Sequence, residues 1–248
     1  LMVAPYAKSP IEIELTTELN SKPYVDMTIE IMKEFGVEIQ REDYSRFTIR
    51  SSQYLSITNY QIESDASAAS YFFAAPAICG GTVKVENISR KSLQGDVGFV
   101  DVLQKMGCDV TEADNSITVN RPSSIVGIDI DMRDIPDTAQ TLATVAPFAD
   151  SPTRIRGIAS ARVKETDRVS ATCTELKRLG VQVEEHQDGM TIYPCQDLQP
   201  ASIKTYNDHR MAMAFSLIGL RFDGVTIENP ACVSKTFPNY YEVLESLR

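Results

Sequence analysis

An internal repeat of about 71 residues constrains the fold of this 248-residue chain more than any other feature of its sequence. Three landmarks recur at intervals of 71 to 73 residues: a glycine that ends an amphipathic helix, an aspartate that opens an apolar helix, and a short strand after that helix. The positions are Gly36, Gly107 and Gly180; Asp65, Asp137 and Asp208; and 82–85, 153–156 and 225–228. A period this long exceeds that of most solenoid repeats and predicts copies of a larger α/β unit.

Each unit is predicted to have a β-α-β-α-β-β order. In the first copy, alternating apolar residues predict a strand at 11–15, and an apolar stripe predicts a helix that starts at Pro23. Residues 37–39 and 47–49 predict a hairpin, and residues 57–62 predict a further strand.

The helices that begin at the three aspartates are apolar on every side, which predicts that they are buried. The simplest role for each aspartate is an N-cap, which stabilises a helix by about 1 kcal/mol. We therefore predict that the helices gather inside and the sheets lie outside, with three units to a globule.

Composition excludes several classes of protein. The net charge of −10 argues against a nucleic-acid partner, and two histidines are too few for a histidine-based metal site. The five cysteines are scattered, which favours reduced thiols in a cytoplasmic protein. No apolar run has the length of a membrane span, so no membrane partner is expected.

Five of the seven residues in the stretch 162–168 are charged, and an amphipathic helical pattern follows them. The pattern predicts that Lys164, Glu165 and Arg168 lie in the first turn of that helix, where the two cations oppose the helix dipole. A bound anion would reverse this effect, because helix N-termini bind phosphates and carboxylates. Lys164 recurs 71 residues later as Lys235. The alternative interpretation is a solvated, self-paired charge run.

A second polar cluster, residues 206–210, opens the last buried helix and includes Arg210. Asp137 and Glu165 could act as proton donor and acceptor if their environments separate their pKa values. Neither a nucleotide-binding loop nor an activated nucleophile is present in the sequence. The residues alone therefore predict cofactor-free group transfer between anionic small molecules.

Six motifs together resemble the 5-enolpyruvylshikimate-3-phosphate synthase family, also named 3-phosphoshikimate 1-carboxyvinyltransferases. They are Ser21–Tyr24, Ser64–Tyr71, Ile135–Asp137, Lys164–Arg168, Tyr206–Met213 and Ser234–Pro238. The resemblance implies the enolpyruvyl transferase fold, an inside-out α/β barrel with three β-α-β-α-β-β units in each of two domains and the substrates between them. By this resemblance, residues 1–62 are expected to end one domain, and residues 63–248 to form a second. It also implies a transferase of the shikimate pathway that moves the enolpyruvyl group of phosphoenolpyruvate to the 5-hydroxyl of shikimate 3-phosphate. The family needs no metal or organic cofactor and is the target of glyphosate; we expect a monomer.

The resemblance also implies roles for individual residues. Asp137 would bind the shikimate hydroxyls and help to deprotonate the attacking one, and Glu165 would protonate the methylene of phosphoenolpyruvate. The other expected contacts to shikimate 3-phosphate are made by Ser21, Tyr24, Ser160 and Lys164. The expected contacts to phosphoenolpyruvate are made by Arg168, Arg210 and Lys235.

Two cationic segments of the family have no counterpart in the sequence, and Leu1 is not an initiator residue. We therefore expect the chain to correspond to the C-terminal portion of the family's sequence and to be inactive alone. Two alternatives remain at this point. One is the related UDP-N-acetylglucosamine enolpyruvyl transferase, and the other is a non-catalytic binding module.

Overall fold

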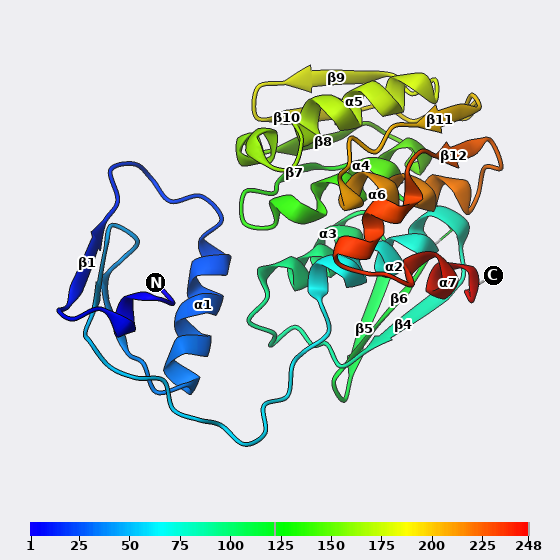
Figure 1. Ribbon diagram of the computed structural model, residues 1–248. Coiled ribbons are helices and arrows are strands. Elements are labelled where there is room, and N and C mark those ends of the chain that lie inside the picture. Colours follow the sequence, from blue (N-terminus) through cyan, green and yellow to red (C-terminus); the bar gives the residue numbers. More distant parts are fainter. Residues whose placement is uncertain (122, 248) are drawn as a thin grey trace. The chain divides into compact units, whose positions relative to one another are not determined.

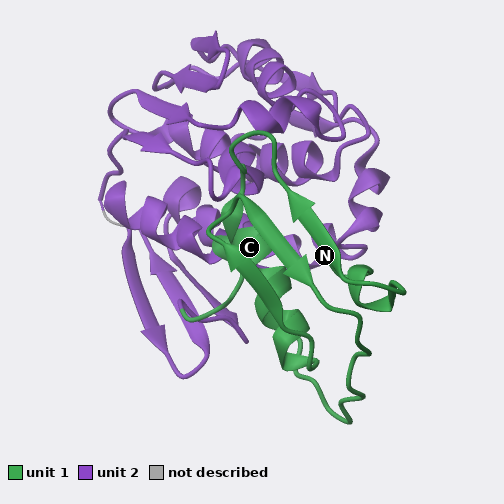
Figure 2. Cartoon of the chain, turned by 90° about the vertical axis from the view of Figure 1, so that its left-hand side faces the viewer, with its two compact units in different colours: residues 1–63, 91–95 green, residues 64–90, 96–248 purple. Residues whose placement is uncertain are grey.

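The computed structural model describes residues 1–121 and 123–247, which fold as two compact units (Figures 1 and 2). Unit 1 comprises residues 1–63 with 91–95, and unit 2 comprises residues 64–90 with 96–248. The predicted domains, 1–62 and 63–248, are those of a longer protein and stay a prediction.

Unit 1 is one helix packed on a three-stranded antiparallel sheet in the order β1-β3-β2. Its small core gathers the buried face of α1 and the inward residues of β3, among them Met32, Phe47 and Ile49. The strand at 11–15, the helix and the hairpin are thus confirmed. The elements are η1 (Ala4–Tyr6), β1 (Ile11–Glu14), α1 (Lys22–Glu34), β2 (Ile39–Glu42) and β3 (Arg46–Ile49).

The strand predicted at residues 57–62 is wrong. No helix or strand lies between Ile49 and Ala66, and the apolar side chains of Ile57 and Ile62 are exposed. Alternating apolar residues favour a strand only where a neighbouring strand accepts its hydrogen bonds and a core covers one face. Neither condition is visible in the sequence of the segment itself.

Three buried helices form the centre of unit 2, as the repeat predicted. They are α2 (Ala66–Cys79), α4 (Ala139–Val145) and α6 (His209–Gly219), and they pack on one another. Their alanines let the helix backbones approach closely, and a buried hydrogen bond of 3.0 Å joins Ser70 of α2 to Thr141 of α4. Almost every residue of the three helices is buried, which explains why none has a strongly polar face.

Sheets and amphipathic helices surround this centre (Figure 1). The sheet orders are β4-β6-β5, β7-β8-β10-β9 and β11-β12, and the pairs β7·β8 and β11·β12 are parallel. The strands are β4 (Thr82–Glu86), β5 (Asp109–Ala113), β6 (Ser116–Asn120), β7 (Asp129–Asp131), β8 (Thr153–Arg156), β9 (Val183–His186), β10 (Gly189–Ile192), β11 (Ala201–Ile203) and β12 (Val225–Ile227). The outer helices are α3 (Phe99–Lys105), α5 (Arg168–Arg178) and α7 (Tyr240–Glu245).

Short 3-10 helices connect these elements and carry several predicted site residues. They are η2 (Gly95–Gly98), η3 (Pro136–Thr138), η4 (Ala146–Phe148), η5 (Ala159–Val163) and η6 (Pro230–Lys235).

The repeat is visible in the backbone at the ends of α1, α3 and α5. Gly36, Gly107 and Gly180 have φ values of 83°, 102° and 82°, a region that side chains with a Cβ rarely adopt. The three glycines are therefore required by the same helix-ending turn in each copy.

Replacement of Asp65 by Ala is expected to lower the free energy of unfolding by about 1 kcal/mol. Asp65 is a true N-cap, because its carboxylate accepts the backbone N–H of Ala68 at 3.0 Å. Asp223→Ala, at an exposed position in the same unit, should change stability by less than about 0.5 kcal/mol. Chemical denaturation of both variants measures the difference, and equal stabilities would contradict the capping role.

Candidate active site

The charged stretch at 162–168 precedes a helix instead of forming its first turn. Asp167 is the N-cap of α5 and accepts the backbone N–H of Ser170 at 2.9 Å. Lys164 and Glu165 therefore lie in the loop between η5 and α5, and only Arg168 is helical. The prediction that Lys164 and Glu165 lie in the first helical turn was wrong, because the capping aspartate, not the charge run, sets the start of the helix.

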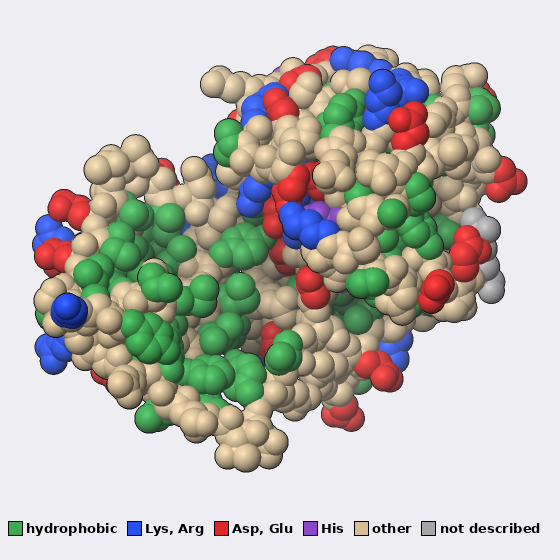
Figure 3. Space-filling model, viewed as in Figure 1, with side chains coloured by type: hydrophobic (Ala, Val, Ile, Leu, Met, Phe, Trp, Pro, Cys, Tyr) green, Lys and Arg blue, Asp and Glu red, His purple; other side chains and the backbone are tan. Residues whose placement is uncertain are grey.

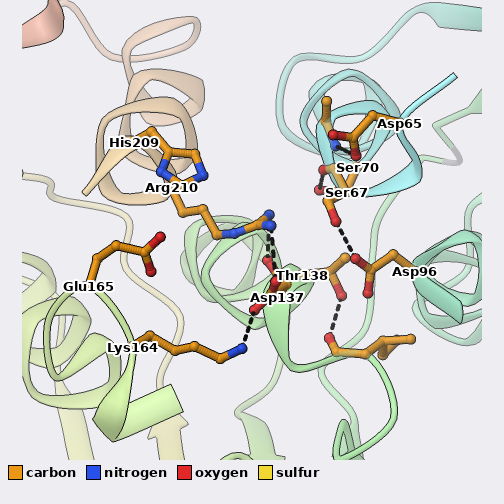
Figure 4. A network of polar contacts seen from close by, with 12 residues as sticks. Asp65, Ser67, Ser70, Asp96, Asp137, Thr138, Lys164, Glu165, His209 and Arg210 are labelled. Atoms are coloured by element: carbon orange, nitrogen blue, oxygen red, sulfur yellow. Dashed lines mark hydrogen bonds and ion pairs between the residues drawn. The ribbon is translucent and has the colours of Figure 1, made fainter. Parts of the chain in front are cut away.

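Asp137 does not cap a helix, whereas Asp65 and Asp208 do. It lies in η3, and its carboxylate binds three cations. Figure 4 shows two of them, Lys164 and Arg210. Arg168 and Arg210 donate to its two oxygens at 3.0 Å each, and the ammonium of Lys164 lies 3.7 Å away. Residues from three successive segments of the chain thus converge on one carboxylate.

Glu165 joins two of the predicted cations. Its Oε2 accepts from Arg168 and its Oε1 accepts from Lys235, both at 2.6 Å. Seven residues of unit 2 are predicted to hold or transform substrate. Six of these seven, all except Ser160, are linked by ion pairs. They are Asp137, Lys164, Glu165, Arg168, Arg210 and Lys235.

Arg168 is the buried centre of this ion-pair cluster. Its side chain is 3% exposed, and it binds the carboxylates of Asp137, Glu165 and Asp208. Asp208 is fully buried; one oxygen accepts from Arg168 Nε at 2.7 Å, and the other caps α6 through the N–H of Arg210. Three carboxylates thus oppose four cations, which leaves one surplus positive charge in a chain whose net charge is −10.

Lysine and arginine side chains are intermixed with acidic ones on the face of unit 2 that Figure 3 shows, rather than gathered into a patch of one sign. The cluster is therefore self-neutralised to within one charge. An anionic ligand that binds in the cluster must displace protein carboxylates from the cations.

The electrostatic environment has a clear effect on Glu165. Its partial burial would raise its pKa, but Lys235 and Arg168 outweigh burial and lower the pKa from 4.5 to about 2. Glu165 is thus a carboxylate at neutral pH. A lowered pKa stabilises the folded state above about pH 4.5, and this contribution is lost as the pH falls through 2.

Two neighbours of the cluster are also shifted. Burial lowers the pKa of His209, and the positive charge of Arg210 lowers it further. Burial alone would lower the pKa of Arg210, but Tyr71, Asp137 and Asp96 raise it. Within the described part of the chain, the Arg210 Nε donor and the His209 ring nitrogen Nδ1 are buried without a hydrogen-bond partner. Such buried polar atoms are rare in folded proteins and commonly meet a ligand or water.

The remaining predicted site residues lie elsewhere. Ser160 is half-buried in η5, four residues before Lys164. Ser21 and Tyr24 belong to unit 1, where Ser21 occupies the N-cap position of α1 but its hydroxyl makes no capping hydrogen bond. Its φ of 57° places the residue in the left-handed region. Their expected contacts with substrate stay predictions.

Sequence reasoning missed the second function of Asp208, which was interpreted only as a cap. A cap uses one acceptor of a carboxylate that has about four. The cation that binds the other acceptors, Arg168, lies 40 residues earlier in the chain, so no local signal identified it. Among residues 1–121 and 123–247, no three His, Cys, Asp or Glu side chains gather in a way that could hold a metal ion. None of the helices described is both long and apolar enough to cross a membrane.

The family model described as EPSP synthase (3-phosphoshikimate 1-carboxyvinyltransferase) matches residues 1–244. The chain belongs to the EPSP synthase family. It is 50% identical to the 3-phosphoshikimate 1-carboxyvinyltransferase of Sulfurovum sp. strain NBC37-1, over all of this chain and 58% of that relative. It is 52% identical to the enzyme of the same name from Cronobacter sakazakii, over 98% of this chain and 57% of that relative.

Solved structures agree with this assignment. An EPSP synthase from Acinetobacter baumannii matches with a TM-score of 0.82 and 25% identity, over 99% of this chain and 58% of that one. The enolpyruvyl transferase NikO from Streptomyces tendae matches with a TM-score of 0.75 and 16% identity, over 99% of this chain and 57% of that one. The fold is therefore the enolpyruvyl transferase fold, as predicted. The chain spans a little under three fifths of the length of these EPSP synthase relatives.

Proposed function

We propose that the protein to which this chain belongs transfers the enolpyruvyl group of phosphoenolpyruvate to the 5-hydroxyl of shikimate 3-phosphate and releases phosphate. The observation that carries this proposal is the ion-pair cluster of unit 2. Four cations and two accessible carboxylates meet in one place, which is the arrangement that two polyanionic substrates and an acid–base reaction require.

The cations can be assigned to substrate groups by their geometry. Arg168 and Arg210 have planar guanidinium groups that suit the carboxylate of phosphoenolpyruvate, and the more exposed Lys235 suits its phosphate as a point charge. The Nε of Arg210 has no hydrogen-bond partner among the described residues, so it can donate to a substrate without first breaking a bond within the protein. Lys164, beside Asp137, would bind the acceptor near its reacting hydroxyl.

The two carboxylates, Asp137 and Glu165, would then transfer protons from and to the substrates. Asp137 accepts the proton of the 5-hydroxyl as the hydroxyl oxygen attacks C2 of phosphoenolpyruvate, and Glu165 delivers a proton to C3. The resulting tetrahedral adduct then returns a C3 proton to Glu165 and breaks its C2–O bond to phosphate, which leaves with the proton held by Asp137. The product is the enolpyruvyl ether, and both carboxylates are restored. Atoms and charge balance without a cofactor, and the orientation of both substrates would supply part of the rate acceleration.

The direct test is phosphate release by the full-length protein with both substrates present. We expect release only with shikimate 3-phosphate as acceptor, and none with UDP-N-acetylglucosamine. Turnover with the nucleotide sugar alone would overturn the assignment in favour of the related transferase. Absence of turnover with either acceptor would favour a non-catalytic role.

The finer properties implied by the family are part of the same proposal. We expect a cytoplasmic monomer that binds neither nucleic acid nor membranes and is a target of glyphosate. Light scattering on the purified protein and a glyphosate titration measure the two most accessible of these properties.

Replacement of Lys235 by Met is expected to raise the KM for phosphoenolpyruvate about 10–100-fold, because one charge-assisted bond to phosphate is worth roughly 1.5–3 kcal/mol. Stability should change little, since the Lys235 side chain is 58% exposed. Lys84→Met is the matched control, because Lys84 is equally exposed and pairs with Glu86 on β4. Steady-state kinetics measure the effect. If both variants have the wild-type KM for phosphoenolpyruvate, Lys235 does not belong to the site.

A further inference from the structure

The segment that leads into α6 is held by α5 at two points. At one end of α5, Arg168 Nε donates to Asp208 at 2.7 Å. Seven residues later on the same helix, Glu175 accepts the hydroxyl of Tyr206 at 2.8 Å and the backbone N–H of Lys204 at 3.1 Å. Positions seven apart lie on the same face of a helix, so one face of α5 forms hydrogen bonds with both ends of the segment 204–208.

The segment 204–208 contains an unfavourable backbone conformation. Tyr206 and Asn207 have φ values of 54° and 57°, so two successive residues that carry a Cβ are left-handed. Such a conformation persists only where its surroundings fix it, and it is concentrated at functional sites. The next residue is the buried Asp208, and Arg210 follows two positions later. The direction in which α6 presents Arg210 therefore depends on this turn.

Glu175 has none of the roles assigned above. It is fully buried, and besides Tyr206 and Lys204 it binds only Arg178, at 3.0 Å, among the residues described. An apolar residue would serve packing alone at lower cost, because a buried carboxylate is unfavourable unless each acceptor finds a donor. Every donor here belongs to α5 itself or to residues 204–206, which lead into the left-handed turn.

We propose that Glu175 is a positioning residue, which acts through Tyr206 to hold the left-handed turn and so sets Asp208 and Arg210 against Arg168 for substrate binding. This inference rests on the proposed function, in which Arg168 and Arg210 bind the carboxylate of phosphoenolpyruvate. It adds a residue that contacts no substrate but sets the affinity of the site for that anion.

The test replaces Tyr206 by Phe and Glu175 by Gln in the full-length protein. Tyr206→Phe is the milder change, because the ring is 39% exposed and only the hydroxyl is lost. We expect each variant to raise the KM for phosphoenolpyruvate about tenfold and to change kcat less than twofold, since small misplacements of binding groups are costly. Tyr193→Phe and Glu184→Gln are matched controls, because the same pair of side chains forms a 2.8 Å hydrogen bond on the exposed surface of β9 and β10.

A second measurement is independent of turnover. His186 and His209 are the two histidines of this chain, and their proton resonances can be assigned in the full-length protein by replacing each in turn. His209 directly follows Asp208, and its pKa responds to burial, Arg210 and Asp208. We expect Tyr206→Phe to shift the titration of His209 and to leave that of His186 unchanged. The control variants should shift neither.

The outcomes separate this inference from the proposed function. Wild-type protein without turnover would refute the proposed function, whereas the His209 shift would still support the positioning of the turn. Active wild type with an unchanged KM and an unshifted His209 in both variants would overturn the role of Glu175. A lower melting temperature with normal KM would also overturn it, because it would show a purely structural role.

Discussion

Replacement of Glu165 by Gln in the full-length protein should lower kcat by about 10²–10⁴-fold, the usual contribution of a positioned proton donor. Glutamine keeps the size of the side chain and its acceptor oxygen but has no proton to give. The KM for phosphoenolpyruvate should not rise, because the substitution frees Lys235 and Arg168 from a competing carboxylate. Steady-state kinetics with each substrate varied measure both quantities.

The control is Glu185→Gln, since Glu185 is also half-exposed and pairs with an arginine, Arg162, at 2.8 Å. It should retain normal kcat. Near-normal kcat in Glu165→Gln would show that another group delivers the proton.

The pH dependence of the reaction adds a second test of Glu165. In the structure its pKa is about 2, so it carries no proton at neutral pH. Substrate phosphate and carboxylate groups would compete for Lys235 and Arg168 and leave the partial burial of Glu165 unopposed, which raises the pKa. We expect kcat, which reports the substrate complex, to depend on a group with a pKa well above 2. That dependence should disappear in Glu165→Gln.

The sequence predicted those parts of the fold that depend on local chemistry. The three helix-ending glycines and the starts of the three buried helices followed from a backbone conformation and from short polar–apolar boundaries. The strand at 57–62 failed because strands need hydrogen-bonding neighbours, and no property of a segment reveals whether a neighbour is present. The start of α5 could have been predicted from Asp167, since an aspartate before an apolar-periodic run is a common N-cap.

The sequence predicted which charged residues of unit 2 gather, but not how they pair. The repeat related Lys164 to Lys235, and the structure links them and Arg210 through Asp137, Glu165 and Arg168. Which carboxylate binds which cation depends on how three helices pack, and this is set by contacts far apart in sequence. The repeat also suggested one role for three aspartates, although only two of them cap a helix.

Replacement of Arg168 by Met should lower the free energy of unfolding by roughly 3–5 kcal/mol, because it removes one partner from a buried ion pair. For a chain of this size the loss corresponds to a fall in melting temperature of roughly 6–20 °C. The reason is Asp208, which is fully buried and keeps its charge while losing its two bonds to Arg168. Arg133→Met is the control, since Arg133 is 57% exposed and pairs with Asp131 at the surface. Its effect should stay below about 1 kcal/mol.

A double variant separates charge from packing. Asn caps helices as well as Asp does, so Asp208→Asn keeps the cap of α6 while it removes the buried charge. If the uncompensated charge of Asp208 causes the loss, Arg168→Met combined with Asp208→Asn should be more stable than Arg168→Met alone by at least about 1 kcal/mol. If the double variant is as unstable as the single one, the loss comes from the packing of the arginine stem instead.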